Sequence, residues 1–343
     1  MINVAINGLG RIGKSILKIL FNEKNINIVF VNDLNPSIQN LCYLVNYDSI
    51  YGNLNDPLIP VGNSLIKYKN QTLKYSNKKN IKNLNLKNVD VLIDSTGKSL
   101  NNSDITFLKK KIKHIIITNI PKKINFDYFL SDINVDRLKK NNFIISSGTC
   151  DGNAVVPIIK LLEDKVKIKF GNITTLHPWL SYQNLMDGPL KSISDPNNIY
   201  STYVLGRSSV GNIIPKTTSV VDVASKIIKN VKSKISCLSY RVPTSIVSCA
   251  EMNFTLEKNL NIKDIKNLFH KFEKNQKYKT IRNFNLPLTS IDLKGSLYCS
   301  NIDHRWTILN GRQLRIVTWY DNEIGYSMNV VNILNKINEN QVN

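Results

Sequence analysis

Apolar and polar residues alternate in two different ways along this chain, and the change falls near residue 150. In the first part, short apolar runs are separated by amphipathic segments such as residues 12–20, a pattern typical of parallel strands joined by helices. The predicted strands are residues 2–6, 26–31, 89–93, 114–118 and 143–147. An Asn- and Lys-rich segment at 62–87 predicts hairpins and loops on one edge of the sheet. We therefore expect an α/β, doubly wound sheet in this part.

In the second part of the chain, longer alternating segments predict mostly antiparallel strands with a few helices, an α+β arrangement. The predicted strands are residues 166–175, 235–241, 245–257, 286–299 and 315–319. Helices are expected at 154–162, 220–229 and 262–273, and a last helix is expected to continue to about residue 337. Residues 181–212 have the composition of a polar loop.

Composition limits the class of protein. The chain has 343 residues, 42% of them apolar and 21% charged, which is ordinary for a globular protein with room for two cores. No apolar run approaches the roughly 20 residues that a membrane span requires. The N-terminus enters a strand without a basic leader segment. These features predict a cytoplasmic protein.

The five cysteines are scattered singly and include no C-x-x-C pair. This spacing argues against a zinc site and against the disulfide framework of a secreted protein, so no metal is expected. Cys150 differs from the others because it lies between the predicted strand 143–147 and a predicted helix. The unpaired N–H groups and the dipole of a helix start favour an anion, and the thiolate is the nucleophilic form of cysteine. Cys150 is therefore a candidate nucleophile, which the change of pattern places in a cleft between two domains.

The formal net charge is +21. Lysines are distributed over the whole length and are densest at 78–79 and 109–111, without a single basic tract that contains aromatic residues. This distribution favours a solvated basic surface over a nucleic-acid site. A basic field also favours the approach of an anionic substrate.

A glycine motif follows the first predicted strand. Gly8, Gly10 and Gly13 have the spacing G-x-G-x-x-G and open a predicted helix. The first glycine makes the turn, the second lets the backbone approach a pyrophosphate, and the third lets helix and strand pack closely. Asp33 ends the second strand about 20 residues later, where a carboxylate accepts from ribose hydroxyls and repels a 2′-phosphate. The segment predicts a Rossmann domain that binds NAD rather than NADP.

Together, these segments resemble the glyceraldehyde-3-phosphate dehydrogenase family over nearly the whole chain, with the segment Trp319–Glu323 the most specific. The resemblance rests on Ile6–Gly13, Tyr47–Ser49, Ser95–Gly97, Cys150 with Asn153, Asn212–Pro215, Arg241–Thr244 and Trp319–Glu323. It implies a NAD-binding Rossmann domain at 1–149, a catalytic domain at 150–314, and a strand and helix at 315–343 that pack back on the first domain. It also implies a homotetramer.

The resemblance assigns roles toward NAD. It implies that Asn322 holds the nicotinamide carboxamide, that Tyr326 packs beside it and that Thr118 faces the nicotinamide end. Lys79 is expected on the adenine side. The other positions implied to contact NAD are Gly8, Gly10, Arg11, Ile12, Gly13, Asp33, Thr96 and Gly97.

The resemblance also implies the reaction. Cys150 attacks an aldehyde to form a thiohemiacetal, hydride passes to NAD, and phosphate cleaves the resulting thioester to an acyl phosphate. His177 matches the family's base. A neutral imidazole can take the thiol proton, and the imidazolium then stabilises the thiolate and the alkoxide.

Several side chains are candidates for binding the two phosphates. Arg241 is the cation expected to bind one of them bidentately. Thr218 and Ser219 fit a second pocket at a helix N-terminus. The remaining candidates are Thr149, Asp151, Ser181 and Arg207.

Several positions depart from the family pattern, and they cluster on phosphate recognition. An Arg-rich loop before Asn212 retains only Arg207. Asp151 replaces a hydroxyl residue, and a carboxylate there repels phosphate and raises the pKa of Cys150 unless it pairs with a cation. Leu180 replaces a threonine, for which Ser181 is a substitute. Ser219 replaces a glycine.

These departures leave more than one interpretation open. The chain is either a divergent phosphorylating enzyme, which the retained Arg241, Thr149 and Thr218 favour, or a dehydrogenase that uses another aldehyde or another acyl acceptor. A semialdehyde dehydrogenase is a related alternative, although the segment 319–323 and Asp33 speak against it. The alternative from another class is a NAD-binding protein without turnover, which the retained catalytic pair makes less attractive.

Overall fold

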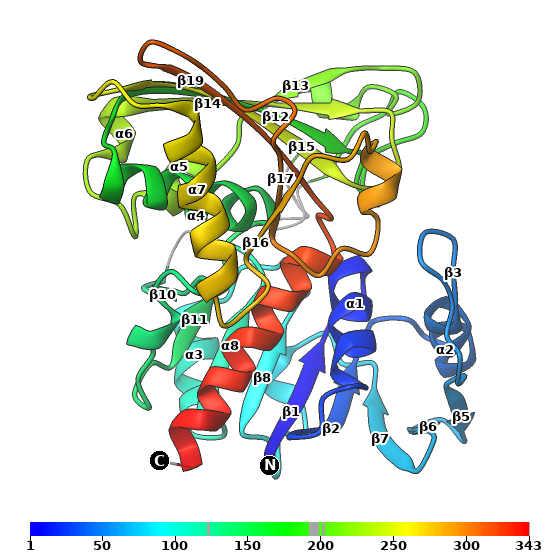
Figure 1. The fold of residues 1–343 in the computed structure, drawn as a ribbon. Coiled ribbons are helices and arrows are strands. Elements are labelled where there is room, and N and C mark those ends of the chain that lie inside the picture. Colours follow the sequence, from blue (N-terminus) through cyan, green and yellow to red (C-terminus); the bar gives the residue numbers. More distant parts are fainter. Residues whose placement is uncertain (122–123, 192–198, 201–202, 343) are drawn as a thin grey trace. The chain divides into compact units, whose positions relative to one another are not determined.

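The structure, a computed structural model, describes residues 1–342 except 122–123, 192–198 and 201–202. The chain forms two compact units, each with its own sheet (Figure 1). Unit 1 comprises Met1–Phe129, Arg137–Ser147 and Val330–Asn343, and unit 2 comprises Leu130–Asp136 and Gly148–Asn329. Part of the predicted polar loop at 181–212 lies outside the described residues.

Unit 1 is built on a nine-stranded sheet. Its strands are β1 (Ile2–Asn7), β2 (Ile26–Asn32), β5 (Ile59–Val61), β6 (Leu65–Tyr68), β7 (Gln71–Ser76), β8 (Val91–Asp94), β9 (His114–Ile117), β10 (Asp127–Tyr128) and β11 (Ile144–Ser146). They lie in the order β10-β11-β9-β8-β1-β2-β7-β6-β5. The pairings from β10 to β7 are parallel and the last two are antiparallel. β3 (Tyr47–Asp48) and β4 (Gly52–Asn53) form a separate short hairpin.

Helices cover both faces of this sheet. They are α1 (Arg11–Leu20), α2 (Ile38–Asn46), α3 (Asn102–Lys109) and the C-terminal part of α8 (Ile324–Val342), with a 3₁₀ turn η1 (Ile81–Asn83). Figure 1 shows α1 and α8 in front of the strands and α3 behind them. The Asn335 side chain on α8 donates to Glu23 just beyond α1 at 3.3 Å. None of the described helices combines the length and apolarity required to cross a membrane.

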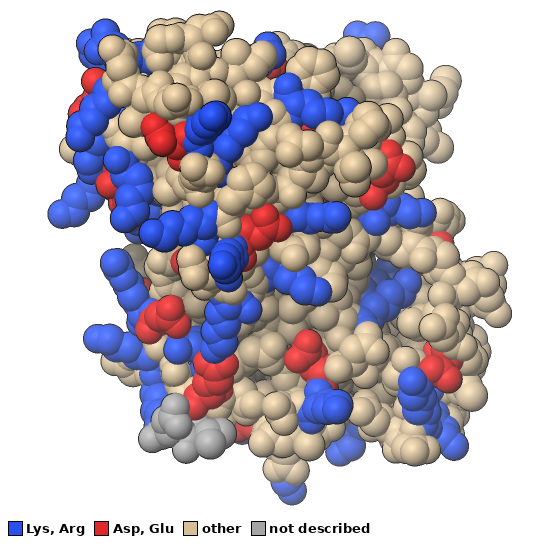
Figure 2. All heavy atoms as spheres, in the orientation of Figure 1, with Lys and Arg blue, Asp and Glu red and all other residues tan. Residues whose placement is uncertain are grey.

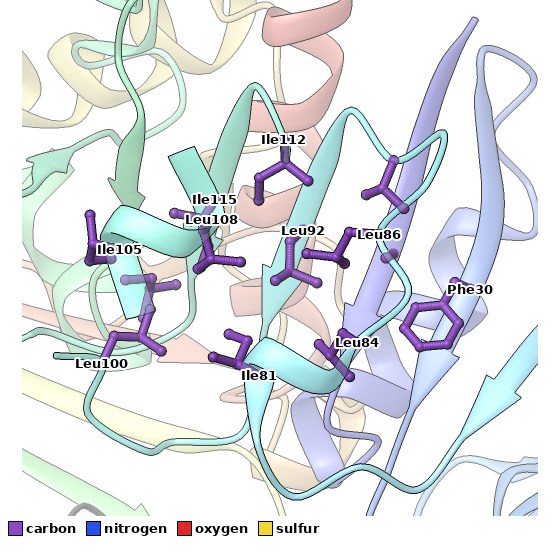
Figure 3. Close-up of a cluster of buried hydrophobic side chains, with 13 residues drawn as sticks. Phe30, Ile81, Leu84, Leu86, Leu92, Leu100, Ile105, Leu108, Ile112 and Ile115 are labelled. Atoms are coloured by element: carbon purple, nitrogen blue, oxygen red, sulfur yellow. The ribbon is translucent and has the colours of Figure 1, made fainter. Parts of the chain in front are cut away.

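A buried cluster fills the space between α3, η1 and one face of this sheet (Figure 3). Leu92 and Ile115 project from neighbouring strands, and Ile105 and Leu108 meet them from α3. The full cluster is Ala5, Phe30, Ile81, Leu84, Leu86, Val89, Leu92, Leu100, Ile105, Leu108, Ile112, Ile115 and Ile117. Each fully buried large aliphatic side chain stabilises the fold by about 1.5–3 kcal/mol. The cluster members Ala5, Phe30 and Leu92 come from β1, β2 and β8, so the cluster joins these three strands to α3.

Unit 2 is built on an eight-stranded mixed sheet. Its strands are β12 (Ile168–Pro178), β13 (Ile214–Lys216), β14 (Ile235–Val242), β15 (Ser248–Leu256), β16 (Ile281–Phe284), β17 (Ser300–Asp303), β18 (Ile308–Asn310) and β19 (Gln313–Tyr320). They lie in the order β13-β14-β12-β15-β19-β17-β16, and β18 pairs with β19. The pairings β12–β14 and β16–β17 are parallel and the others antiparallel. The predicted combination of an α/β part and an α+β part is confirmed.

Four helices of unit 2 lie on one side of its sheet (Figure 1), namely α4 (Cys150–Lys165), α5 (Val220–Ala224), α6 (Val231–Lys234) and α7 (Ile262–Asn275). Unit 2 also contains the first part of α8, the 3₁₀ turns η3 (Tyr203–Gly206) and η4 (Ser290–Leu293), and the first two residues of η2 (Val135–Arg137). α4 contacts β12, β17 and β19, and α5 contacts β14. On β12 and β14, the side chains of Phe170, Leu176 and Leu238 alternate with the buried ones and remain 57%, 43% and 40% exposed. The sheet therefore has one covered face and one partly apolar open face.

Two local predictions are wrong. Residues 286–299 do not form a strand, because a capping box between Thr289 and Asp292 starts η4 and Gly295 turns the chain at φ +78°. The predicted helix 220–229 ends at Ala224, where the Ser225 hydroxyl donates to the carbonyl of Asp222 and competes with the helical pattern.

The predicted C-terminal segment 315–343 divides between the two units. Its strand is part of β19, which pairs with β15 and β17 inside the sheet of unit 2. Only Val330 and the residues after it belong to unit 1.

Candidate active site

Helix α4 begins at Cys150, four residues before the predicted start. Gly148 turns the chain at φ +73°, and Thr149 then caps the helix because its Oγ1 accepts from the amide of Gly152 at 3.2 Å. A left-handed backbone of this kind is natural only for glycine. The cap fixes the Cys150 side chain at the first turn of the helix. Thr149, a predicted phosphate ligand, is thus engaged with the helix itself.

His177 lies near the end of β12 and faces the cysteine. Its Nε2 is 3.3 Å from the Cys150 sulfur, and its Nδ1 is 2.8 Å from the carbonyl oxygen of Pro178. Because a carbonyl only accepts, we assign the ring proton to Nδ1, which leaves the Nε2 lone pair facing the sulfur. Burial, reinforced by Arg241, lowers the pKa of His177 to about 4. The imidazole is therefore neutral at pH 7 and oriented to accept the thiol proton.

Asp151 is buried beside the thiol and is held by hydroxyl groups. Its Oδ1 accepts from the Tyr320 hydroxyl at 2.8 Å and from the Cys150 thiol at 3.5 Å, and its Oδ2 accepts from Thr218 at 3.2 Å. Burial raises the pKa of Asp151, but His177, the Tyr320 hydroxyl and Arg241 outweigh burial and lower it overall. Asp151 is therefore an ionised carboxylate whose described partners are hydroxyls and the thiol rather than a Lys or Arg side chain.

The thiol is consequently harder to ionise than its position at a helix start predicts. Burial and the negative charge of Asp151 raise the pKa of Cys150 well above its usual value, and Arg241 opposes them only in part. The prediction of an easily ionised cysteine is wrong for this resting arrangement, because burial and the neighbouring carboxylate exceed the helix-start effect. Cys150 instead donates toward two acceptors, His177 Nε2 and Asp151 Oδ1.

The strand register adds two cations on the same face. Arg241 of β14 pairs with His177 of β12 on one side and with Ile214 of β13 on the other. Lys216 lies two residues beyond Ile214 on β13 and pairs with Ser239. Residues two apart on a strand, and residues paired across strands, share a face of the sheet. Lys216, Arg241 and His177 therefore project from one face.

Lys216 is a site residue that the sequence analysis missed. One sequence signal could have found it. Lys216 lies two residues after Ile214 on the same short strand, so its side chain shares a face with that buried residue. Burial lowers the pKa of Lys216, and the charge of Arg241 adds to the effect, whereas Asp151 opposes it. The lysine thus belongs electrostatically to the catalytic cluster.

Arg241 is only 6% exposed, and its Nε has no hydrogen-bond partner among the described residues. A buried guanidinium nitrogen without an acceptor is costly, so it marks a place for an anion. With Cys150 and His177 neutral, Arg241 and Lys216 contribute two positive charges against the single negative charge of Asp151. The cluster therefore has a surplus positive charge.

Unit 1 contains a cavity of about 590 Å³ at the carboxyl ends of β1, β2 and β8. This is where a doubly wound sheet binds its ligand. Five of the predicted cofactor contacts line it, namely Gly8, Gly10, Asp33, Lys79 and Thr96. Arg11, Ile12, Gly13, Gly97 and Thr118 are not among its lining residues. Arg11 instead forms an ion pair with Asp48 at 2.9 Å.

The glycine-rich turn has the shape that a dinucleotide needs. A Cβ on Gly13 would lie 1.9 Å from the carbonyl oxygen of Gly8, whereas a Cβ on Gly10 would meet no described atom within 4 Å. Gly10 is the N-cap residue of α1 and has no side chain that could accept from the first amides of the helix. These amides can therefore receive a pyrophosphate. Asp33 accepts from the amides of Leu9 and Asn35 at 2.7 and 2.8 Å, which fixes its carboxylate at the cavity. These residues fit NAD.

Comparison with known proteins agrees with both halves of this description. The family model for the glyceraldehyde 3-phosphate dehydrogenase NAD binding domain matches residues 2–102, and the model for the C-terminal domain of the same enzyme matches residues 149–322. Glyceraldehyde-3-phosphate dehydrogenase 2 of Staphylococcus epidermidis is 30% identical over 98% of this chain and 96% of its own length. Glyceraldehyde-3-phosphate dehydrogenase of Priestia megaterium is 28% identical over 97% of each chain.

The chain belongs to the glyceraldehyde-3-phosphate dehydrogenase family. The comparisons support NAD as the cofactor of this dehydrogenase, as the sequence predicted.

Two predicted nicotinamide contacts of the dehydrogenase lie in unit 2. Asn322 is 5% exposed, and its Oδ1 has no hydrogen-bond partner within the described part of the chain. The Tyr326 hydroxyl donates to the carbonyl of Gly148 at 3.2 Å. Thr118, in unit 1, donates from both its amide and its hydroxyl to the carbonyl of Asp94. Their roles toward the nicotinamide stay predictions.

The predicted phosphate ligands of the dehydrogenase are only partly brought together. Thr218 meets Asp151, as described above, near Arg241. Ser181 is exposed, and Arg207 is an exposed residue paired with Asp187 at 2.8 Å. Ser219 precedes α5 without capping it, and α5 has only five residues, so a helix N-terminus contributes little there.

Proposed function

We propose that this chain catalyses the NAD-dependent oxidation of glyceraldehyde 3-phosphate, with phosphate as the acyl acceptor and 1,3-bisphosphoglycerate as the product. The observation that carries the proposal is the 3.3 Å pairing of the Cys150 sulfur with the neutral Nε2 of His177, beside the unpaired Nε of the buried Arg241. We take glyceraldehyde 3-phosphate as the aldehyde because the chain belongs to the glyceraldehyde-3-phosphate dehydrogenase family. The roles toward NAD that the resemblance assigns to Asn322 and Tyr326 are part of this proposal.

Proton transfer and nucleophilic attack are coupled in this mechanism. Because the Cys150 thiol resists ionisation, it gives its proton to His177 Nε2 as the sulfur attacks the aldehyde carbon. The Nδ1–H bond to Pro178 keeps the ring in place during the transfer. The imidazolium that forms lies 4.0 Å from Asp151 Oδ1, so the carboxylate stabilises it.

His177 then acts a second time. Its imidazolium gives the Nε2 proton to the oxygen of the thiohemiacetal, and the neutral imidazole takes that proton back as the hydride leaves and the carbonyl of the thioester forms. NAD, when bound, supplies the hydride acceptor. The surplus positive charge of Arg241 and Lys216 attracts the phosphate groups of the substrates.

A second candidate function differs in the acyl acceptor or in the aldehyde. Thr218 and Tyr320 donate to Asp151, so their hydroxyls are already used, and the carboxylate repels an incoming phosphate. These contacts favour a dehydrogenase that passes its acyl group to water or to another acceptor, or that oxidises a different aldehyde.

One kinetic experiment separates these possibilities. Purified protein is mixed rapidly with NAD and glyceraldehyde 3-phosphate, with and without phosphate, and NADH is followed by absorbance. A burst of about one NADH per site followed by phosphate-dependent turnover supports the proposal. A burst followed by turnover that does not depend on phosphate supports the second candidate. The absence of a burst with any short phosphorylated aldehyde refutes the enzyme assignment, and Cys150→Ser serves as the control without a nucleophile.

We further propose a cytoplasmic homotetramer without a nucleic-acid partner. The exposed Phe170, Leu176 and Leu238 on the open sheet face offer apolar area for a second copy. The five cysteines are free thiols, as is usual in a reducing compartment. Figure 2 shows Lys and Arg scattered among Asp and Glu on the visible face rather than gathered in one stripe. Light scattering of wild type and Leu176→Lys tests the assembly, and unchanged mass in the variant counts against this face.

A further inference from the structure

Cys150, Asp151 and His177 bring three metal-ligand atoms together inside unit 2. We propose that these three side chains bind one zinc ion, and that the bound ion switches off the dehydrogenase. The binding site stands on the geometry of the chain alone. Only the inhibitory effect rests on the proposed function.

The spacing of the three atoms suits a tetrahedral ion. The Cys150 sulfur lies 3.3 Å from His177 Nε2 and 3.5 Å from Asp151 Oδ1, and the last two atoms are 4.0 Å apart. With the usual Zn–S and Zn–N or Zn–O bond lengths, the ligand atoms of a tetrahedral zinc are about 3.4–3.6 Å apart. The sulfur–oxygen distance already matches, the sulfur–nitrogen distance is short by about 0.2 Å, and the nitrogen–oxygen distance needs a contraction of about 0.6 Å. Three protein ligands leave a fourth position for water or an anion.

The surroundings of the three ligands are those of a metal site. His177 donates its Nδ1–H to the carbonyl of Pro178 at 2.8 Å, which leaves Nε2 free to coordinate. Asp151 is oriented by Tyr320 at Oδ1 and by Thr218 at Oδ2, at 2.8 and 3.2 Å. Such outer contacts fix the tautomer and the direction of metal ligands. The site therefore needs little rearrangement before it can bind.

The ligand types select the metal. Thiolate and imidazole nitrogen favour zinc, whereas magnesium and calcium prefer an all-oxygen environment. Binding exchanges the thiol proton of Cys150 for a Zn–S bond, and the proton is released to solvent. One dication thus replaces one proton, and the charge of the cluster rises by one.

The nearby cations make this site distinctive. Arg241 and Lys216 project from the same sheet face as His177 and oppose the rise in charge. Removing the charge of Lys216 should therefore tighten zinc binding, whereas removing Asp151 should weaken it. A merely adventitious metal on surface groups responds to neither change.

Binding at this site blocks catalysis. A zinc-bound thiolate is not a free nucleophile, and the Nε2 lone pair that accepts the thiol proton is occupied by the metal. Asp151, the position at which the chain departs from the family pattern, supplies the third ligand. The spacing of the cysteines predicted no metal site. It could not detect this one, because only one ligand is a cysteine and the ligands come from the start of α4 and the end of β12.

Cobalt(II) provides the direct test, because a cobalt–thiolate bond gives an intense near-ultraviolet charge-transfer band. The full-length wild-type protein is titrated with Co²⁺, and zinc affinity is then measured by competition with a chromogenic chelator. We expect one ion per chain, a charge-transfer band that Zn²⁺ abolishes, and loss of the band in Cys150→Ser. Asp151→Asn should weaken zinc binding at least tenfold and Lys216→Met should strengthen it. Cys237→Ser, which changes a cysteine of β14 outside the ligand set, is the matched control and should behave as wild type.

The outcomes separate the two parts of the inference. Absence of the band in wild type, or a zinc affinity that Asp151→Asn leaves unchanged, overturns the site. Circular dichroism verifies that each variant is folded. If Cys150→Ser does not fold, Asp151→Asn and Lys216→Met still decide the test. If zinc binds stoichiometrically and NADH formation continues at its full rate, the inhibitory effect is overturned. If zinc binds but no aldehyde is oxidised even without metal, the proposed function fails while the site stands.

Discussion

Replacing Asp151 by Asn removes a negative charge 3.5 Å from the sulfur of Cys150. The amide has nearly the same size as the carboxylate, and its oxygen can still accept from the Tyr320 hydroxyl. The main change is therefore electrostatic. Because the carboxylate opposes thiolate formation, Asp151→Asn should lower the pKa of Cys150 and make the thiol more reactive toward an alkylating agent at pH 7.

The size of the effect follows from the distance. Two unit charges 3.5 Å apart repel by about 5 kcal/mol at an effective dielectric constant of about 20. Arg241 and local relaxation reduce this value, and even about 1.4 kcal/mol corresponds to a tenfold increase in thiolate. A thiolate of lower pKa is also intrinsically less nucleophilic, which removes about half of the gain on a logarithmic scale. The alkylation rate should rise by about 3-fold to about 60-fold.

The assay is the second-order rate of iodoacetamide modification, followed at Cys150 by peptide mass spectrometry. The matched control is Asp222→Asn, which removes an exposed carboxylate of α5 that pairs with Lys232 at 2.6 Å and should leave the rate unchanged. Faster modification at lower pH in Asp151→Asn alone supports the reasoning. An unchanged or slower rate would refute it, because it would show that Asp151 does not oppose the thiolate.

Three further predictions concern cofactor binding and stability. Asp33→Ala should lower the NAD to NADP ratio of kcat/KM at least tenfold, because the carboxylate that repels a 2′-phosphate is gone; an unchanged ratio means that Asp33 is not at the ribose. Gly13→Ala should abolish NADH binding measured by fluorescence, since its Cβ would lie 1.9 Å from the oxygen of Gly8; wild-type affinity would contradict the packing. The pKa values of His177 and His304 are both lowered to about 4, so the unfolded chain takes up protons first as pH falls below about 6.5. The free energy of unfolding in urea should therefore decrease from pH 7 to pH 4, by up to about 3 kcal/mol for each histidine. If His304→Gln leaves the slope of stability against pH unchanged, His304 does not contribute to it.

The fold of unit 1 was predictable because its signals are local. Apolar runs mark the parallel strands, and the glycine spacing places the turn and the start of α1. Asp33 lies at the cavity for the same reason, since it follows directly from the end of β2. The wrong strand at 286–299 has the opposite cause, because the capping contact between Thr289 and Asp292 overrides an apolar pattern.

The catalytic site was predictable only in part, because its geometry depends on strand register. The sequence marks Cys150 and His177 individually, but the pairing of β13 with β14 and of β14 with β12 places Lys216 beside them. A single sequence does not tell which strands are neighbours, and so it hides this cation. The hydroxyl partner Tyr320 was hidden in the same way, 169 residues from Asp151.

The acid at position 151 and the neighbouring cations Arg241 and Lys216 explain one another. A carboxylate in this position, without partners, would be costly to bury and would repel an anionic substrate. Two hydroxyls satisfy its oxygens, and Arg241 with Lys216 more than balance its charge. The cluster therefore combines a protonated thiol with a positive surplus, and the thiol proton passes to His177 during the attack rather than in the resting protein. A bound phosphate dianion would reduce the surplus and raise the proton affinity of His177, which assists the proton transfer that the attack requires.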